Sequence, residues 1–334
     1  MRMDRSQAQG LLARMRGNPV AVLGDLMLDE YLFGDVDRIS PEAPVPIVRV
    51  TRERAVLGGA ANVAANLKSV GAEPVLVGTL QQDVAGNRLQ ALLRGLEIGA
   101  DCLVIDPTRP TIIKTRVIGQ QQQMLRIDRE EPEACREAAV DGLCSRLGKA
   151  LERASALIIS DYAKGTVCEP VMDRVRELCR VRGIPWVVDP KPSHAAMYRG
   201  APLMTPNTKE LGELTGMPAK GDADLAAAGQ ALMASLGLQG LLVTRSEKGM
   251  ALFVADTRHR APWLIPTEAR EVFDVSGAGD TVIAVFSAAL ATGADWKDAA
   301  MLANAAAGVV VGKMGTATAT PEEILHHYQD QEAL

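Results

Sequence analysis

The sequence predicts an α/β fold with a doubly wound, mostly parallel sheet that has helices on both faces. Short apolar runs alternate with longer helical patterns along most of the 334 residues. Hydrophobic residues make up 47% of the chain but aromatic ones only 3%, so the core must consist of Ala, Val, Leu and Ile, which suits helices on a parallel sheet. No linker or repeat marks a second domain, so we expect a single domain over 1–334.

The predicted strands are short apolar runs, and the predicted helices carry apolar residues at helical spacing. The strands cover 20–23, 74–78, 156–159, 185–188 and 240–243. The helices cover 60–70, 85–96, 133–153, 169–182, 222–236, 278–291 and 296–313. This βαβ order predicts parallel strands joined by crossover helices.

Two segments rich in β-branched residues interrupt this order. One is 45–50, and the other is 111–127, which predicts a hairpin with strands 111–118 and 124–127 joined through Gly119 and 120–123. A small sheet made of such separate pieces cannot bury both of its faces alone. We therefore expect a lid built from about 30–50 and 111–127, and a homodimer formed through this lid.

Charge and cysteine content narrow the class of protein. The net charge is −5, with 36 basic and 41 acidic residues interspersed, which argues against nucleic acid or a membrane as partner. The 5 cysteines show no C-x-x-C spacing, so we expect reduced thiols. No apolar stretch is long enough to cross a bilayer or to form a secretory signal. These features predict a soluble, cytoplasmic protein that binds a small molecule.

The segment 274–281 carries the strongest chemical signal. Gly277, Ala278 and Gly279 are small enough for another molecule to approach the backbone, and the helix that follows directs its N–H groups to the same space. Asp280 lies in this turn, where a carboxylate can deprotonate a hydroxyl that attacks a phosphoryl group. The alternative is that Asp280 only caps the helix.

Two further groups of residues suit a polyol ligand. Asp25 and Asp29 follow the first predicted strand, at the sheet edge where such folds bind ligands. Gly58 and Gly59 allow close approach of a ligand, and the Asn62 amide can donate to and accept from sugar hydroxyls. The alternatives are a turn at the end of the strand for the carboxylates and simple helix packing for the glycines.

The string Asp274-x-Ser276-Gly-Ala-Gly-Asp280 resembles the C-terminal signature of the ribokinase-like, or PfkB, carbohydrate kinases. The resemblance extends from residue 20 to about 321. It implies a ribokinase-like fold, ATP and Mg²⁺, with Asn207 and Glu210 orienting the metal ion and its waters. The alternative for this pair is a capping box at a helix start.

The same resemblance assigns other nucleotide and cation residues. Thr244 and Gly249 match the family's nucleotide-phosphate loop, and Asn304 lies on the helix that walls the adenine pocket in relatives. The alternative for Asn304 is an amide on an exposed helix face. Asp274 and Ser276 match positions near a monovalent-cation site in some relatives, which makes K⁺ a further candidate.

Other motifs resemble the kinases of bacterial ADP-heptose synthesis. They are Phe33-Gly34, the run from Arg38 to Pro46, Lys114-x-Arg116-Val117 and Leu125-Arg126-Ile127-Asp128. The resemblance implies phosphorylation of D-glycero-β-D-manno-heptose 7-phosphate at O1, which gives the 1,7-bisphosphate used for lipopolysaccharide core. Many of these kinases are fused to a nucleotidyltransferase with a His-x-Gly-His motif. This sequence lacks the motif, so we expect a stand-alone kinase and a separate adenylyltransferase.

A phosphorylated substrate would need cationic partners, because a buried dianion must be paired. Lys191 is the first candidate and Arg126 the second, with Lys114 and Arg116 also available; the alternative is scattered surface charge. Two other functions stay open. One is a kinase for another acceptor, such as fructose 6-phosphate or a nucleoside, and the other is a non-catalytic nucleotide-binding regulator.

Overall fold

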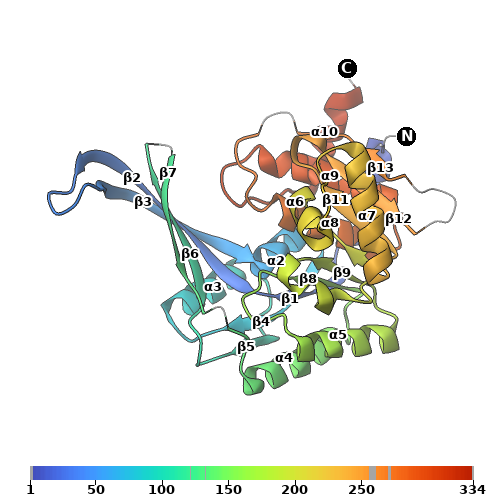
Figure 1. Ribbon diagram of the computed structural model, residues 1–334, viewed down its shortest axis with the longest axis horizontal. Coiled ribbons are helices and arrows are strands. Elements are labelled where there is room, and N and C mark those ends of the chain that lie inside the picture. Colours follow the sequence, from blue (N-terminus) through green and yellow to red (C-terminus); the bar gives the residue numbers. More distant parts are fainter. Residues whose placement is uncertain (1–2, 121, 132, 256–260, 270–271, 333–334) are drawn as a thin grey trace.

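A computed structural model describes residues 3–120, 122–131, 133–255, 261–269 and 272–332. The main sheet is built from β1 (Pro19–Gly24), β4 (Glu73–Leu80), β5 (Leu103–Ile105), β8 (Ala156–Ser160), β9 (Trp186–Asp189), β10 (Leu203–Met204), β11 (Gly240–Thr244), β12 (Met250–Val254) and β13 (Trp263–Ile265). Their order is β13-β12-β11-β10-β9-β8-β1-β4-β5 (Figure 1). In this spatial order, the seven neighbouring strands β11, β10, β9, β8, β1, β4 and β5 are parallel to one another. Strand β12 pairs antiparallel with β11 and with β13. The prediction of a mostly parallel sheet is therefore confirmed.

Helices cover both faces of this sheet (Figure 1). They are α1 (Arg5–Met15), α2 (Ala60–Ser69), α3 (Val84–Gly95), α4 (Glu137–Ala150), α5 (Glu169–Arg182), α6 (Thr208–Thr215), α7 (Asp222–Leu236), α8 (Ala278–Ala291), α9 (Trp296–Val311) and α10 (Pro321–Glu332), with short 3₁₀ turns η1 (Pro192–Tyr198) and η2 (Ser246–Lys248). Alternate residues of β1 point to opposite faces: Val20 and Val22 join the core on the side of α2 and α8, and Ala21 and Leu23 the core on the side of α4 and α5. The doubly wound arrangement is confirmed.

Several predicted bounds differ from the observed ones. Helix α4 starts at Glu137 rather than 133, because the backbone N–H of Cys135 donates to the Gly165 carbonyl and holds the preceding segment outside the helix. The sequence patterns missed α1 and α10 and the strands β5, β10, β12 and β13, and they offered α6 only as the alternative interpretation of Asn207 and Glu210. Strand β10 has 2 residues, too short for a periodic pattern. Among the described residues, no helix is both long and apolar enough to cross a membrane.

The second sheet projects from the main body (Figure 1) and consists of β2 (Leu26–Ile39), β3 (Pro46–Gly59), β6 (Ile112–Gly119) and β7 (Gln122–Arg129), in the order β3-β2-β6-β7. The predicted hairpin is β6–β7, although Gln121 of its turn lies outside the described residues. Strands β2 and β3 reach far beyond the predicted 45–50. Asp29 therefore lies within a strand, and the strand-end turn suggested for it is wrong.

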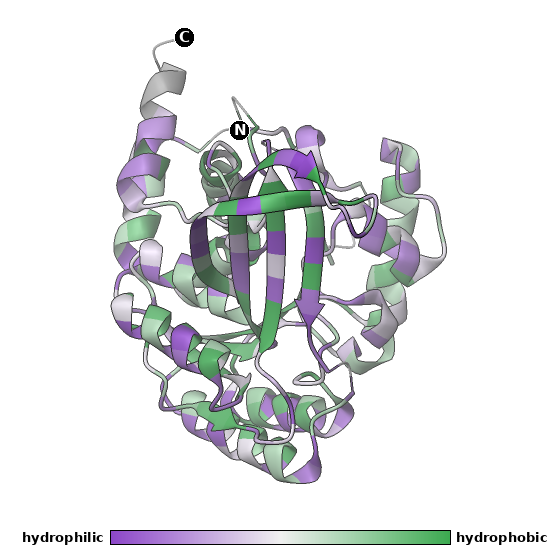
Figure 2. Cartoon of the chain, turned by 90° about the vertical axis from the view of Figure 1, so that its left-hand side faces the viewer, coloured by the Kyte–Doolittle hydropathy of each residue, from purple (hydrophilic) through white to green (hydrophobic). Residues whose placement is uncertain are grey.

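The small sheet has two chemically different faces, and Figure 2 shows hydrophilic and hydrophobic residues alternating along its strands. On one face, Tyr31 of β2 lies opposite Arg54 of β3 and Arg116 of β6. On the other face, Leu125 and Ile127 of β7 are 55% and 51% exposed. One face is thus polar and cationic, and the other is partly apolar.

Candidate active site

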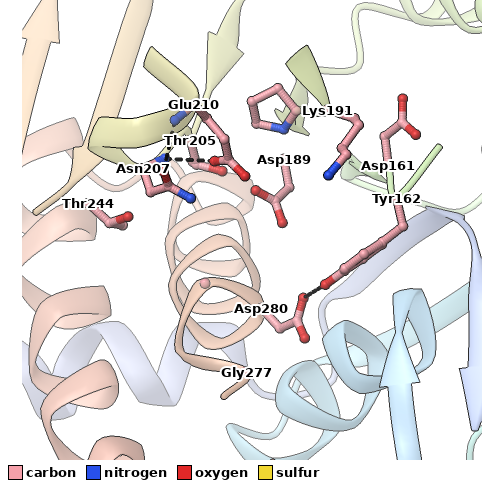
Figure 3. A pocket seen from close by; sticks show the side chains of 12 residues that line it. Asp161, Tyr162, Asp189, Lys191, Thr205, Asn207, Glu210, Thr244, Gly277 and Asp280 are labelled. Carbon is pink, nitrogen blue, oxygen red and sulfur yellow. Dashed lines mark hydrogen bonds between the residues drawn. The ribbon is translucent and has the colours of Figure 1, made fainter. Parts of the chain in front are cut away.

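A cavity of about 210 Å³ lies at the carboxyl ends of β8, β9, β10 and β11 and at the start of α8 (Figure 3). Asp161 and Tyr162 follow β8, Asp189 ends β9, Thr205 follows β10 and Thr244 ends β11. The carboxyl ends of parallel strands all meet at this edge, because every crossover returns the chain in the same direction. The site therefore lies where a doubly wound sheet binds ligands.

Asp280 is the titratable group at the centre of this site. It is 6% exposed in the first turn of α8, with Oδ2 accepting a hydrogen bond from Asn62 Nδ2 at 2.7 Å and Oδ1 from the Tyr162 hydroxyl at 2.8 Å. Burial raises the pKa of Asp280 to about 6, the Asn62 and Tyr162 bonds act to lower it, and the Asp29 charge adds to the rise. A carboxylate with this pKa can accept a proton near neutral pH.

The turn before α8 has the shape that the glycines predicted. Gly277 has φ +80°, and a Cβ there would lie 2.9 Å from Asn62 Nδ2. A Cβ on Gly279 would meet nothing within 4 Å, so this backbone is open to the cavity. The first helical bond joins the Thr281 N–H to the Gly277 carbonyl, so the N–H groups of Gly279 and Asp280 precede the helical ladder and can bind an anion.

Ala278 contributes less to this anion site than the sequence predicted. Its N–H donates to the Val275 carbonyl at 3.2 Å, within the turn itself. The side chain is a single methyl group that packs against the main core. Ala278 thus shapes the turn, and the N–H groups of its two successors face the ligand space.

Asp25 organises the segment that carries Tyr162. It is fully buried, and its carboxylate accepts the backbone N–H groups of Tyr162, Lys164 and Thr166 at 2.9, 3.0 and 3.0 Å. Asp25 therefore lies in the turn at the end of β1, as the structural alternative suggested, and its carboxylate binds the segment that follows β8. These three bonds leave Asp25 poorly placed to accept bonds from sugar hydroxyls.

Asp29 and the glycine pair meet at the base of the small sheet. Asp29 Oδ1 accepts a hydrogen bond from Arg116 Nη1 at 2.6 Å. A Cβ on Gly58 would lie 2.5 Å from Asp29 Oδ2, and one on Gly59, which has φ +55°, would lie 2.4 Å from the Asp25 carbonyl oxygen. Contacts within the chain therefore require both glycines, as the packing alternative suggested.

Asn207 and Glu210 form the capping box that was the structural alternative for them. The Glu210 N–H donates to Asn207 Oδ1 at 2.9 Å, and the Asn207 N–H donates to Glu210 Oε2 at 2.8 Å. Both also line the cavity, close to Asp189 (Figure 3). The capping bonds engage one oxygen of each side chain, so the second Glu210 oxygen stays available to a ligand.

The donor set around the cavity suits a hydrated divalent cation. Burial and the charges of Glu210 and Asp280 raise the pKa of Asp189 well above its usual range, and Lys191 opposes this rise. The side chains of Asp161, Asp189, Glu210 and Asp280 thus all line one cavity, and a bound cation would relieve the repulsion among their charges. In the described part of the chain, no group of three or more His, Cys, Asp or Glu side chains is arranged to hold a metal ion directly, so contacts to Mg²⁺ here would be made largely through the waters of the ion.

The remaining nucleotide candidates occupy different environments. Thr244 lines the cavity, whereas Gly249, at φ +79°, turns the chain between β11 and β12. Asn304 is 4% exposed and donates from Nδ2 to the Pro266 carbonyl at 2.8 Å, so the exposed-amide alternative is wrong. It fixes the strand-to-loop segment that follows β13.

The two cation-site candidates shape the turn before Gly277. Asp274 accepts the N–H of Ser276 at 2.9 Å and that of Gly315 at 3.0 Å.

The cationic side chains that are candidates for binding a substrate phosphate lie apart: Lys191 lines the cavity beside Asp189, whereas Arg126 lies on β7 and pairs with Asp128. Of the four candidate cationic side chains, Lys191 therefore lines the cavity, whereas Arg126, Lys114 and Arg116 lie on the small sheet.

Sequence reasoning missed Tyr162, Asp161 and Asp189 as site residues. Asp161 and Tyr162 follow the predicted strand 156–159 almost directly, and Asp189 follows 185–188. The rule that ligands bind at the carboxyl ends of parallel strands would have identified all three. The Tyr162 bond to Asp280 had no signal in the sequence, because it depends on the loop geometry that Asp25 sets.

Solved structures share this fold over nearly the whole chain. The ribokinase of Arabidopsis thaliana, solved with ribose and ATP, matches with a TM-score of 0.75 and 21% identity over 94% of this chain and 99% of its own. Phosphofructokinase-2 of Escherichia coli, solved with potassium, matches with a TM-score of 0.78 and 18% identity over 95% of this chain and 99% of its own. The fold is therefore ribokinase-like.

Relatives at higher identity include two named bifunctional protein HldE. The one from Paramagnetospirillum magneticum is 45% identical over 312 residues, which cover 93% of this chain and 63% of the relative. The one from Actinobacillus pleuropneumoniae is 46% identical over 314 residues, 93% of this chain and 64% of the relative. The chain thus spans just under two thirds of their length.

The model of the family described as pfkB family carbohydrate kinase matches residues 18–323. This range begins just before β1 and ends within α10, so it includes the cavity, the turn before α8 and the small sheet. The chain belongs to the pfkB family of carbohydrate kinases.

Proposed function

We propose that this kinase transfers the γ-phosphoryl group of ATP to O1 of D-glycero-β-D-manno-heptose 7-phosphate and forms the 1,7-bisphosphate. The observation that carries the chemistry is Asp280, with its pKa of about 6, beside the open backbone at Gly279. The choice of substrate rests on the motifs shared with heptose kinases, which include Leu125-Arg126-Ile127-Asp128. The product would serve ADP-heptose synthesis, in which an adenylyltransferase acts later.

The transfer uses Asp280 as general base. Asp280 takes the proton of the O1 hydroxyl while O1 bonds to the γ-phosphorus, and the bond from this phosphorus to the bridging oxygen breaks, so ADP leaves with the electron pair. The N–H groups of Gly279 and Asp280 stabilise the negative charge of the phosphoryl oxygens. An anomeric hydroxyl is more acidic than an ordinary alcohol, so a base of modest pKa suffices.

The nucleotide would bind along the carboxyl edge, with Asn207 and Thr244 beside its phosphates and Gly249 and Asn304 shaping the pocket around the rest. Mg²⁺, held by Glu210 and Asn207 largely through water, would supply countercharge to the phosphates. A K⁺ ion would lie near Asp274 and Ser276. On the sugar side, Asp29 and Asn62 offer the polar contacts, and Asp25, Gly58 and Gly59 hold them in place.

The test is ADP release with four acceptors: heptose 7-phosphate, fructose 6-phosphate, ribose and adenosine. Strong turnover with the heptose phosphate alone would support both mechanism and substrate. Turnover with another acceptor would support the kinase activity and contradict the proposed heptose substrate. ATP binding without turnover on any acceptor would favour the non-catalytic regulator.

We also propose a homodimer that forms through the small sheet. Leu125 and Ile127 expose apolar surface on β7, and a second copy of the sheet would bury it. Light scattering at micromolar concentration should give twice the chain mass. A monomeric mass would contradict the proposal.

A further inference from the structure

Three arginines and one tyrosine form a row across the polar face of the small sheet. Tyr31 lies opposite Arg54 on one side and Arg116 on the other, and Arg116 lies opposite Arg126. Residues in register on neighbouring strands point to the same face, so these side chains share one surface. The row therefore concentrates positive charge on the polar face.

The arginines in this row differ in what they bind within the chain. Arg126 donates two hydrogen bonds to Asp128, at 2.9 and 3.0 Å, and Arg116 donates to Asp29 at 2.6 Å. Within the described ranges, Arg54 has no acidic partner and no hydrogen bond from its side chain. Because a guanidinium binds a phosphate through free N–H groups, Arg54 is the member of the row that is ready to do so.

Arg54 also lies where the small sheet meets the catalytic turn. A Cβ on Gly315 would lie 3.8 Å from Arg54 Nη1 and 3.7 Å from the Tyr31 hydroxyl oxygen. The next residue, Thr316, lies against the turn before α8, where a Cβ on Gly277 would be 3.3 Å from Thr316 Cγ2. The short segment 315–316 thus separates Arg54 from the turn that holds Asp280.

Two buried hydroxyl groups occupy this junction. The hydroxyl oxygens of Tyr31 and Thr316 are inaccessible to solvent and lie close to each other: burial raises the pKa of Tyr31, and the Thr316 hydroxyl opposes this rise. Tyr31 is only 5% exposed. Buried polar groups are almost always paired, so these two hydroxyls serve each other and link β2 to Thr316 beside Arg54.

We propose that Arg54, which lies beside Tyr31 and the segment 315–316, binds the phosphate of a sugar-phosphate acceptor at the end remote from the reacting hydroxyl. This inference rests on the proposed function for the identity of the acceptor. In heptose 7-phosphate, the phosphate is on C7 and the reacting oxygen on C1, at opposite ends of the sugar. An acceptor that extends from Asp280 past residues 315–316 to Arg54 would place its O1 hydroxyl at Asp280 and its phosphate at Arg54.

The experiment compares kcat and KM for heptose 7-phosphate and for the unphosphorylated heptose, in wild type, Arg54→Ala, Arg54→Lys and Arg49→Ala. Arg54→Ala should raise the KM for the phosphorylated sugar by roughly 10- to 100-fold, since charge-assisted bonds are lost, and should leave kcat/KM for the unphosphorylated sugar unchanged. Arg54→Lys should recover part of the loss. Arg49→Ala removes one charge from the same strand, where Arg49 forms an exposed pair with Asp35. This variant should leave the kinetic constants for both sugars unchanged.

The outcomes separate this inference from the proposed function. If wild type uses heptose 7-phosphate but Arg54→Ala affects both sugars equally or neither, only the role of Arg54 is overturned. If wild type uses another sugar phosphate and Arg54→Ala selectively impairs it, the heptose substrate is overturned and Arg54 keeps its role. If wild type accepts only unphosphorylated sugars, both are overturned.

Discussion

The Tyr162 hydroxyl donates a 2.8 Å hydrogen bond to Asp280 Oδ1, and the backbone N–H of the same Tyr162 donates to Asp25. Asp25 thereby fixes the loop that directs Tyr162 at the base, while Asn62 holds the other Asp280 oxygen at 2.7 Å. Both donors favour the charged carboxylate, and burial disfavours it. The pKa of about 6 results from the larger effect of burial.

The pH dependence of kcat/KM should report this balance. Asp280 must be ionised to accept the proton, so activity should fall as the pH drops below about 6. Tyr162→Phe removes a donor that lowers the pKa of Asp280, so the pKa should rise and the acid limb should move up by about one pH unit.

The matched control for this profile is Tyr198→Phe, because the Tyr198 hydroxyl donates to Asp161 and not to Asp280. Its acid limb should coincide with that of wild type. An unchanged limb in Tyr162→Phe, measured from pH 5 to 8, would show that this bond does not tune the base.

Asp280→Asn should reduce kcat by roughly 10²- to 10⁴-fold, because an amide of the same shape cannot accept the proton. ATP affinity, measured by calorimetry, should stay within a few-fold of wild type. Asp298→Asn is the control, because Asp298 occupies the first turn of the neighbouring helix α9. This variant should leave both kcat and the ATP affinity unchanged. Near-normal ADP release from Asp280→Asn would remove Asp280 from the role of base.

Helix bounds were predictable where Pro and Gly mark them. Helix α5 spans Glu169–Arg182 as predicted, with Pro170 in its first turn and Gly183 in the left-handed conformation at its end. Strand β2 was not predictable in the same way. Its segment 26–39 contains acidic residues and a glycine, and it becomes a strand through pairing with β3 and β6.

The site was predictable in its parts but not in its connections. The glycine turn and Asp280 were predictable because the glycines, the helix start and the carboxylate are neighbours in the sequence. The bond from Asn62 to Asp280 joins residues 218 positions apart, and no local pattern encodes it. For the same reason, Asp25 looked like a sugar ligand, although its carboxylate is engaged by three N–H groups from the loop after β8.

Alanine at Gly277 and at Gly279 should have different consequences. At Gly277 the positive φ and the 2.9 Å approach of Asn62 Nδ2 oppose a side chain, so Gly277→Ala should lower both the melting temperature and kcat. At Gly279 the space is open, so Gly279→Ala should melt like wild type but raise the KM for ATP, because the new methyl group enters the proposed phosphate site. Thermal unfolding and ADP release measure both. An unchanged KM for ATP in a well-folded Gly279→Ala would argue against phosphate binding at this turn.

Asp25→Ala should lower the free energy of unfolding by about 3 kcal/mol, because three backbone N–H groups lose their acceptor in a buried place. Urea unfolding measures this loss. Asp35→Ala is the matched control: its pair with Arg49 has side chains 61% and 64% exposed and should contribute little. If Asp25→Ala were as stable as the control but bound the sugar weakly, Asp25 would be a substrate ligand. A large loss of stability would instead assign Asp25 to holding Tyr162, and through it the base, in position.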